Sequence, residues 1–296
     1  MALSMQQEFS RGLPDSKPTP GPRGAALLRN GDENEVLEFL SARPVHTVYM
    51  ASLIRDNGLT SEFNRGSFYG CRRGNALVGV ALLGHAIVMD TESEGCIKAF
   101  AELAKQHSPA HLIRGEKKQI ETFWSYYAQG ERNARCFAGE LLLQLKELPT
   151  TEPVPELRQA TLDDLEEVVN VNAAMACSES GVNPLTRDAD GFRERAARRI
   201  GKGRIWVWVK NRRLIYKTDI IAQTPEATYL EGVYVVPDQR AKGYGLRCIS
   251  QLAKLLLTGT KTICLTVNEK SVGSQRFYTR AGYELACRYD TIYLDD

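Results

Sequence analysis

The chain has 296 residues, which at roughly 150 residues per domain predicts two domains or one large one. Hydrophobic residues make up 43% and charged residues 25%, a composition typical of globular proteins that excludes disordered, collagen-like and fibrous classes. The 38 lysines and arginines nearly balance the 36 aspartates and glutamates, which excludes bulk electrostatic attraction to nucleic acid or to a membrane surface. Any anion site must therefore be local.

No apolar stretch of the sequence reaches the roughly 20 residues that would span a bilayer. The first ten residues lack both a basic start and an apolar signal core, so nothing in them directs the chain to export. The seven cysteines are scattered and never form a CxxC pair, which argues against a disulfide framework and against a zinc site. We expect a cytoplasmic protein with reduced thiols, no metal and no membrane partner.

Four prolines among polar residues predict that residues 1–23 form a disordered tail. From 24 to 147, the hydrophobic periodicity predicts a mixture of helices and strands in a definite order. We expect helices at 33–40 and 47–56, strands at 67–72, 76–83 and 85–90, a helix at 94–106, a strand at 111–114, a helix at 117–127 and a strand at 137–145. A proline-rich stretch at 148–155 is typical of a stiff, extended linker.

The second half, 156–296, repeats nearly the same order of elements. We expect a strand at 156–160, helices at 161–171 and 192–200, strands at 205–209, 214–222 and 228–236, a helix at 245–257, a strand at 262–267, a helix at 273–281 and a strand at 283–294. The simplest interpretation is two copies of one α+β topology fused in tandem, each a mixed, mostly antiparallel sheet flanked by helices.

A glycine-containing loop joins the strand at 228–236 to the next helix. Its core is Arg240-Ala241-Lys242-Gly243-Tyr244-Gly245. A helix start of this kind leaves several backbone N–H groups unpaired beside the positive helix end, which makes a candidate pyrophosphate cradle. Gly243 and Gly245 would let phosphates approach the backbone, and Arg240 or Lys242 would add charge. The loop has neither a P-loop nor a dinucleotide-binding pattern, and a turn that merely starts a helix is the alternative.

Two motifs together carry a family resemblance. Arg240-x-x-Gly243-x-Gly245, after a strand that ends in Val-Pro, resembles the acetyl-CoA loop of the GNAT N-acetyltransferase superfamily. Asn268, Ser274, Phe277-Tyr278 and Gly282-Tyr283 follow the next strand in an order similar to the second motif of that family, although Ser271 and Ser274 replace the family's usual Asn and Ala. The first half has the acidic turn Thr91-Glu-Ser-Glu94 where the loop would lie, so it resembles a degenerate GNAT copy that does not bind coenzyme A.

The resemblance implies roles for individual residues. The backbone of Val233 and Val235 would pair with the pantetheine arm, the amides from Ala241 to Gly245 would hold the pyrophosphate, and Asn268 and Ser271 would contact coenzyme A. Tyr278 would protonate the departing thiolate, or else be only a packed aromatic residue. Glu231 would be the general base for the amine, or else an edge carboxylate paired with an arginine. The two-residue period of a strand places Glu231 on the same face as Val233 and Val235.

Two further features are candidates for the acceptor side. Glu179 lies where this superfamily usually admits the acceptor and could attract an amine, although a solvated carboxylate near a helix end is the alternative. A basic run could meet an anionic substrate or the 3′-phosphate of coenzyme A, or form a solvated helix face. The run consists of Arg193, Arg195, Arg198, Arg199, Lys202 and Arg204.

The resemblance implies an acetyl-CoA-dependent N-acetyltransferase in which an amine attacks the thioester directly and no metal is required. The acceptor would be a small-molecule or peptide amine, and the first half would shape the acceptor cleft or form a homodimer. One alternative is a non-catalytic acyl-CoA sensor or scaffold. Another is a Fem-like or mycothiol-synthase-like tandem GNAT transferase, although the balanced charge offers little to hold tRNA.

Overall fold

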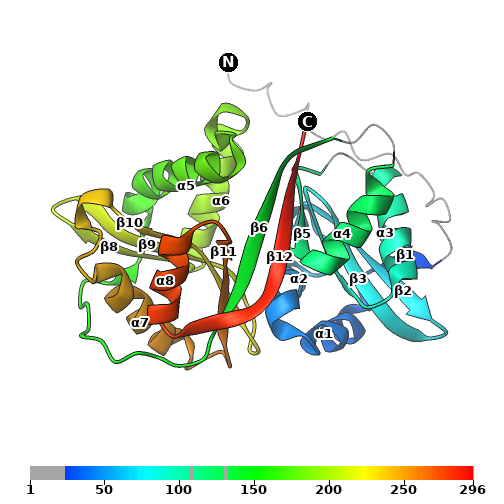
Figure 1. The fold of residues 1–296 in the computed structure, drawn as a ribbon, viewed down its shortest axis with the longest axis horizontal. Helices are drawn as coiled ribbons and strands as arrows, with labels where there is room; N and C mark the ends of the chain where they lie inside the picture. The colour runs from blue at the N-terminus through cyan, green and yellow to red at the C-terminus, as the bar shows by residue number, and fades with distance from the viewer. Residues whose placement is uncertain (1–23, 107–109, 130–132, 296) are drawn as a thin grey trace, which may run out of the picture.

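The computed structural model describes residues 24–106, 110–129 and 133–295, so the expected tail at 1–23 lies outside the described residues. One twelve-stranded sheet runs through both halves in the order β1-β2-β3-β4-β5-β12-β6-β11-β10-β9-β8-β7. Helices cover both of its faces (Figure 1). Short 3-10 helices lie at Glu62–Asn64, Leu162–Asp164, Pro184–Thr186 and Pro237–Gln239.

The first half contributes β1 (Ala25–Leu27), β2 (Gly66–Arg73), β3 (Ala76–Gly84), β4 (Ala86–Thr91) and β5 (Leu112–Glu116). Alternating side chains send Phe68, Val80 and Leu82 toward α1 (Glu33–Ser41) and α2 (Pro44–Asn57). The intervening residues, such as Ala81 and Leu83, pack against α3 (Glu94–Gln106) and α4 (Lys117–Tyr127) on the other face. Every helix expected in this half is present, and two short elements, β1 and the 3-10 helix at Glu62–Asn64, were not expected.

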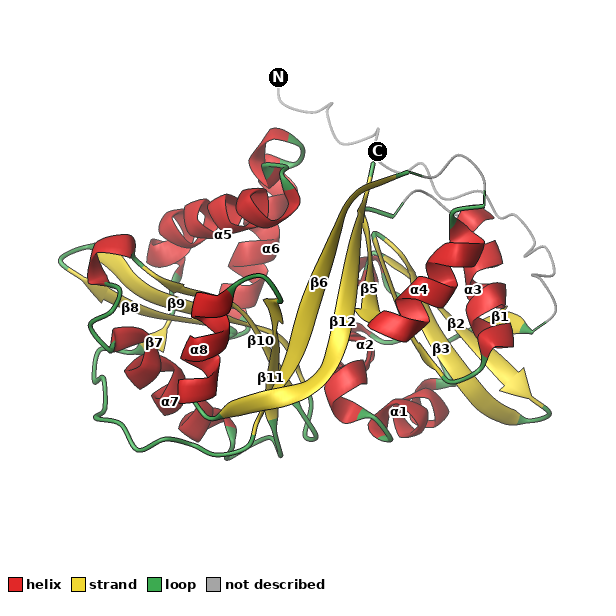
Figure 2. Ribbon diagram, in the orientation of Figure 1, coloured by secondary structure: helices red, strands yellow, loops and turns green. Residues whose placement is uncertain are grey.

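The second half contributes β7 (Arg158–Gln159), β8 (Ile205–Lys210), β9 (Arg213–Gln223), β10 (Thr228–Val235) and β11 (Ile263–Asn268). One face carries α5 (Leu165–Ser180) and α6 (Ala189–Gly201), and the other carries α7 (Tyr244–Leu256) and α8 (Val272–Arg280), as Figure 2 shows. In each half, three antiparallel strands are followed by a parallel pair, β4 with β5 and β10 with β11. The predicted α+β fold, one topology used twice, is therefore confirmed.

The halves exchange their last strands. β6 (Ala134–Leu145), the last strand of the first half, pairs with β11 of the second half. β12 (Tyr283–Leu294), the last strand of the second half, pairs with β5 of the first. The two exchanged strands also pair with each other along their whole length and run side by side through the middle of the molecule (Figure 1). The halves are thus interlocked, which the order of elements along the chain did not indicate.

The stretch at 148–155, predicted as an extended linker, lies within a connection from 146 to 157 that contains no helix or strand and packs onto α7. Val154 is buried in the core of the second half. Its main-chain N–H donates to Gln251 Oε1 at 2.5 Å, and its carbonyl accepts from Gln251 Nε2 at 3.0 Å. These bonds replace a strand pairing for the linker backbone and hold it against the helix.

Helix α2 of the first half also lies on the sheet of the second. Val48 packs with Leu142, Ala222 and Cys264 in a small core that both halves build. Ser52 Oγ accepts a hydrogen bond of 3.0 Å from the main-chain N–H of Gln223. The first half therefore covers part of the sheet of the second half.

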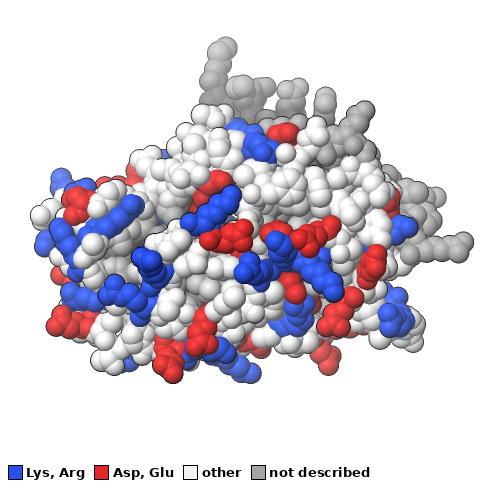
Figure 3. All heavy atoms as spheres, in the orientation of Figure 1, with Lys and Arg blue, Asp and Glu red and all other residues white. Residues whose placement is uncertain are grey.

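Acidic and basic side chains are interspersed over the face shown in Figure 3. This distribution agrees with the near-neutral formal charge of +2. Within the described residues, no helix combines the length and the apolar run that crossing a bilayer requires.

Gly282, the residue immediately before β12, has a conformation that only glycine adopts easily. Its φ is +86°, and a Cβ there would lie 1.7 Å from the carbonyl oxygen of Glu147. We expect Gly282→Ala to lower the free energy of unfolding by about 2 kcal/mol or more, measured by chemical denaturation. Gly201→Ala is the matched control, because a Cβ there meets no atom within 4 Å, and it should change stability by less than about 1 kcal/mol. Equal effects of the two substitutions would contradict this account.

Candidate active site

Strand β10 contains a β-bulge at the point where it approaches the middle of the molecule. Glu231 pairs with Asp219 of β9 and Tyr234 pairs with Lys217, so two residues of β10 lie opposite one residue of β9. The bulge begins at Gly232, whose φ is +62°. A glycine at the first position of a bulge adopts this left-handed conformation without strain.

The bulge coincides with the separation of β10 from β11. The two strands pair in parallel only from Thr228 to Leu230 on β10, opposite Ile263 to Leu265 on β11. Beyond that point β11 continues to pair with β6 as far as Asn268. The edge of β10 from 231 to 235 is therefore left without a neighbouring strand among the described residues, and unpaired main-chain groups of this kind bind extended ligands by strand addition.

The bulge also changes the face on which Glu231 lies. Cross-strand partners share a face, so Glu231 lies on the face of Asp219, whereas Val235 pairs with Tyr216 on the opposite face. The expectation that Glu231 shares a face with Val235 is wrong, because the two-residue period holds only in a regular strand. Glu231 consequently faces the side of the sheet that α5 and α6 cover.

The loop after β10 gathers free main-chain amides at the start of α7. Within the described residues, the N–H groups from 241 to 246 have no main-chain acceptor. Gly243, with a φ of +79°, precedes the helix, and a Cβ there would meet no atom within 4 Å. A Cβ on Gly245 would lie 3.1 Å from Val235 and 3.2 Å from Phe277, so this glycine lets α7 pack closely on β10. Several convergent amides at a helix N-terminus fit a pyrophosphate group.

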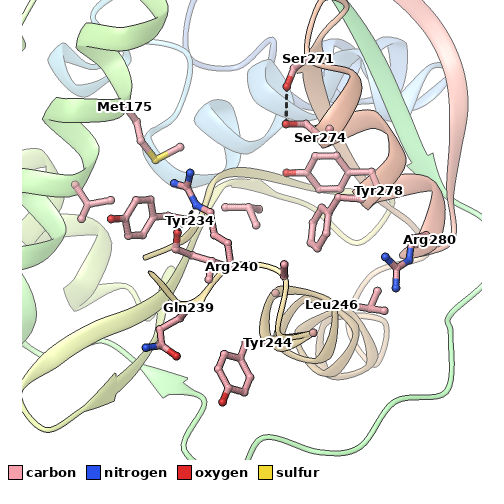
Figure 4. Close-up of a pocket in the computed structure, with 18 of the residues that line it drawn as sticks. Met175, Tyr234, Gln239, Arg240, Tyr244, Leu246, Ser271, Ser274, Tyr278 and Arg280 are labelled. Atoms are coloured by element: carbon pink, nitrogen blue, oxygen red, sulfur yellow. Dashed lines mark hydrogen bonds between the residues drawn. The ribbon is translucent and has the colours of Figure 1, made fainter. Parts of the chain in front are cut away.

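An open cleft of about 960 Å³ lies between these amides, α5, β10 and α8. Figure 4 shows Met175 of α5 and Tyr278 of α8 on opposite sides of it, with Arg240 between them. Eight of the ten residues expected to bind coenzyme A line this cleft: Val233, Val235, Arg240, Ala241, Gly243, Tyr244, Gly245 and Ser271.

The other two expected residues lie elsewhere. Lys242 is not among the residues that line the cleft, and its Nζ donates to Gln239 Oε1 at 3.0 Å. Asn268 lines a second cavity, and its Oδ1 accepts from the main-chain N–H of Lys270 at 2.8 Å. Ser271, at the position of the family's usual asparagine, donates to Ser274 Oγ at 2.8 Å (Figure 4). Arg280 also lines the cleft and is a cation that the sequence motifs did not single out.

The second cavity has a volume of about 530 Å³. Its walls include residues of the first half and of the exchanged strands, Arg114 on β5, Glu140 on β6 and Tyr293 on β12. It adjoins the cleft, since six residues line both: Met175, Ser178, Val233, Ser271, Ser274 and Tyr278. Two spaces thus meet beside the bulge, one bordered by free amides and the other by charged side chains.

Tyr278 lies at this junction. Its side chain is 9% exposed and contacts the rings of Phe277 and Tyr283 at centroid distances of 5.0 and 5.7 Å. Burial raises the pKa of its phenol, with a smaller contribution from the negative charge of Glu179. The hydroxyl therefore stays protonated and can act as a hydrogen-bond or proton donor. Tyr278 is both a packed aromatic residue and a lining residue of the two spaces.

Glu231 is held in the second cavity by two partners. Arg114 Nη1 donates to its Oε1 at 2.8 Å and the Tyr229 hydroxyl donates to the same oxygen at 3.0 Å. Arg114 is shared, because its Nε also lies 3.0 Å from Glu140 Oε2. The predicted pairing of Glu231 with an arginine is therefore present, yet 40% of its side chain remains exposed to the cavity. Both partners fix the orientation of the carboxylate.

Glu179 lines the same cavity near the end of α5, where it is also exposed at the surface, as the alternative of a solvated carboxylate near a helix end predicted. Within the described residues it forms no salt bridge, unlike Glu231. Partial desolvation by the cavity walls raises its pKa to about 7, and the nearby charges of Glu231 and Glu140 add to this effect. This carboxyl group therefore changes its charge near neutral pH.

Several residues of the site carried no signal that identified them. Arg114 and Glu140 come from the first half and reach Glu231 only because the strands are exchanged. Lys217 and Asp219 could have been noticed in the sequence, since both are charged residues within an apolar strand. Lys217 is fully buried, and its Nζ lies 2.6 Å from Asp219 Oδ1, while Asp219 Oδ2 accepts from Asn172 Nδ2 at 3.1 Å.

The corresponding connection in the first half, between β4 and α3, has no comparable cradle. Thr91 Oγ1 accepts from the main-chain N–H of Ser93 at 3.1 Å and donates to the carbonyl of Val78 at 2.7 Å. Glu92 and Glu94 flank this turn. Their carboxylates would repel a phosphate, so this turn does not offer an anion site like the one at the start of α7.

Residues 216–292 match the family model described as FR47-like protein. No curated protein matches the sequence. Among solved structures, a Drosophila protein superposes with a TM-score of 0.67 at 12% identity, covering 92% of this chain and 98% of its own.

Two further structures extend the comparison. A GNAT-family acetyltransferase from Colwellia psychrerythraea has a TM-score of 0.53 at 14% identity and covers 92% of this chain and 99% of its own. A tandem GNAT protein from the clavulanic acid biosynthesis pathway has a TM-score of 0.55 at 12% identity and covers 90% and 97%. The chain therefore has the GNAT acetyltransferase fold in its tandem form, with an FR47-like segment in its second half.

Proposed function

We propose that the protein is an acetyl-CoA-dependent N-acetyltransferase that transfers the acetyl group directly to an amine. The observation that carries this proposal is the junction of two spaces at Val233 and Tyr278. The wider cleft ends at free amides suited to a pyrophosphate, and the cavity contains carboxylates suited to an amine. Such a pair of adjoining sites holds two reactants in contact, which is the largest requirement of a direct transfer.

The residues around the cleft fit coenzyme A. The amides from 241 to 246 would hold the pyrophosphate, and the open edge of β10 would pair with the amide groups of the pantetheine arm. Arg240 and Arg280 line the same cleft and would add positive charge. When bound, acetyl-CoA supplies the thioester whose carbonyl carbon the amine attacks.

The residues at the junction of the two spaces would carry out the proton transfers and stabilise the developing charge. An acceptor that enters as an ammonium ion would first lose one proton to solvent and become the neutral nucleophile. During the transfer, Glu231 would take the second proton from this nitrogen, and the Tyr278 hydroxyl would give a proton to the sulfur that leaves the acetyl group. The main-chain N–H groups of the bulge beside Val233 stabilise the negative charge that develops on the carbonyl oxygen. Arg114 and Tyr229 keep the Glu231 carboxylate directed at the cavity.

Glu179 has a different task in this proposal. An amine enters as an ammonium ion, and an ionised carboxylate without a salt bridge inside the cavity attracts it. Because Glu231 and Glu140 already share Arg114, Glu179 is the carboxylate whose charge remains to be balanced by the ammonium group.

Gly243→Glu tests the cofactor cleft. A carboxylate among the free amides would repel the pyrophosphate, so we expect the affinity for coenzyme A, measured by titration calorimetry, to fall by about 100-fold. Gly181→Glu is the matched control, because Gly181 has a similar φ of +75° and equally open surroundings but lies outside the cleft. Equal binding by both variants, or no binding of coenzyme A by the unmodified protein, would refute the cleft as the cofactor site.

Tyr278→Phe separates catalysis from binding. We expect kcat for thiol release to fall about 100-fold while the KM for acetyl-CoA changes less than about threefold, because the ring packing is kept and only the proton donor is lost. The measurement is thiol release with a panel of amines. If the unmodified protein binds acetyl-CoA but no amine promotes thiol release, the protein is an acyl-CoA sensor rather than an enzyme.

The charge of Glu179 predicts a pH dependence. Since its pKa is raised to about 7, the carboxylate is largely ionised above pH 7 and increasingly neutral below it. We therefore expect the KM for the amine to rise as the pH falls from 8 to 6. Glu179→Gln should have a high KM that stays nearly constant over this range, whereas Glu231→Gln should lower kcat at every pH and keep the KM trend. A KM trend that survives Glu179→Gln would assign the titration to another group.

A further inference from the structure

In the basic run that begins at Arg193, one residue, Arg199, differs from the others in its contacts. Five of its six members have acidic or polar partners: Arg193 with Glu166, Arg195 with Asp188, Arg198 with Asn57, Lys202 with Asp56 and Arg204 with Asp56. These contacts fasten α6 to α5, to its own first turn and to α2. Most of the run therefore serves the fold, and Arg199 forms no ion pair or hydrogen bond among the described residues.

Arg199 points inward rather than along the solvated face. Its neighbours one turn before and one residue after, Ala196 and Ile200, are buried in the core of the second half. Arg199 lines the second cavity, and its Nε is buried without an acceptor. A guanidinium group stays charged at every physiological pH, so a partly buried one without a partner is unfavourable unless an anion occupies the cavity.

Within the described part of the chain, no carboxylate pairs with Arg199. Glu140 and Glu231 are bound by Arg114, and Asp219 is bound by Lys217. Glu179, the remaining carboxyl group of the cavity, makes no salt bridge with Arg199 among the described contacts. The cavity thus has one unbalanced carboxyl group from α5 and one unbalanced guanidinium from α6, on separate helices.

We propose that Arg199 binds a carboxylate of the acceptor, so that the substrate is a small free amino acid rather than a polyamine or a protein amine. This inference rests on the proposed function, since it places the amine of the same molecule beside Glu231 and Glu179. A planar guanidinium matches a carboxylate with two parallel hydrogen bonds. The volume of about 530 Å³ accommodates a free amino acid within the cavity.

The complementary pair of charges explains the selectivity that we infer. A zwitterion satisfies both Glu179 and Arg199 at once. A polyamine such as spermidine would place a cation near Arg199, and an amine without a carboxylate would leave the guanidinium without a partner. Sites that hold a buried polar group for one ligand discriminate strongly against analogues that lack its partner.

The test compares acids with their amides. The unmodified protein, Arg199→Gln and Arg199→Lys are assayed for thiol release with the common α-amino acids, their carboxamides, spermidine and a lysine-containing peptide. We expect the unmodified protein to prefer an amino acid over its carboxamide by about 100-fold in kcat/KM, and Arg199→Gln to lose most of that preference. Arg199→Lys should retain part of it. Arg198→Gln is the matched control on the same helix and should keep the preference.

A binding measurement tests the role of Arg199 without relying on enzymatic turnover. With coenzyme A present, calorimetry should detect binding of the preferred amino acid to the unmodified protein and to Arg198→Gln, but at least about tenfold weaker binding to Arg199→Gln. If amines are acetylated without preference for a carboxylate, or if spermidine or the peptide is the best acceptor, the assignment of Arg199 is overturned while the proposed function stands. If no amine promotes thiol release, the proposed function fails, and amino-acid binding that ignores Arg199 would overturn the inference separately.

Discussion

The pairing of β6 with β11 on one side and with β12 on the other joins the halves and builds the site. Through this pairing, Glu140 of the first half lies beside Arg114, and Arg114 reaches Glu231 of the second half. A single GNAT-like unit would end its sheet with its own strands and would lack these two groups. The second cavity thus belongs to both halves, although the residues that line the cleft all come from the second half.

A second constraint acts at the bulge. Lys217 is fully buried, and a Cβ on Gly232 would lie 2.7 Å from its Nζ, so the left-handed glycine and the buried lysine require each other. Burial lowers the pKa of Lys217, and the contact with Asp219 opposes that effect. Replacing Lys217 or Asp219 alone by a neutral residue would leave the charge of the other uncompensated behind β10, which is strongly destabilising. The bulge that separates β10 from β11 therefore lies against a buried polar pair, Lys217 and Asp219, and Asp219 also lines the second cavity.

The helices and strands could be predicted because their signals are local. The edges of α3 and α4 and of β12 follow directly from hydrophobic periodicity, and the two glycines of the cofactor loop lie where the predicted motif puts them. The strand exchange could not be predicted from local sequence patterns, because the apolar pattern of β6 is compatible with pairing to either neighbour. Nor did they reveal the face of Glu231, since one extra residue at Gly232 reverses every alternation that follows it. Arg114 was missed for the first reason and the orientation of Glu231 for the second.

In the function that we propose, the two spaces use different parts of the chain for recognition, and the difference follows from the ligands proposed for them. A pyrophosphate is the same in every acyl-CoA, so main-chain amides at a helix start suffice, and no excess of positive charge is needed. Acceptors differ in the positions of their charged groups. The cavity must therefore recognise an acceptor by side chains that lie opposite those groups. There, Arg114 and Lys217 are neutralised within the protein, which makes them part of the scaffold. Glu179 and Arg199 are left with opposite charges and no ion pair between them, and a ligand that carries both an ammonium and a carboxylate group balances both.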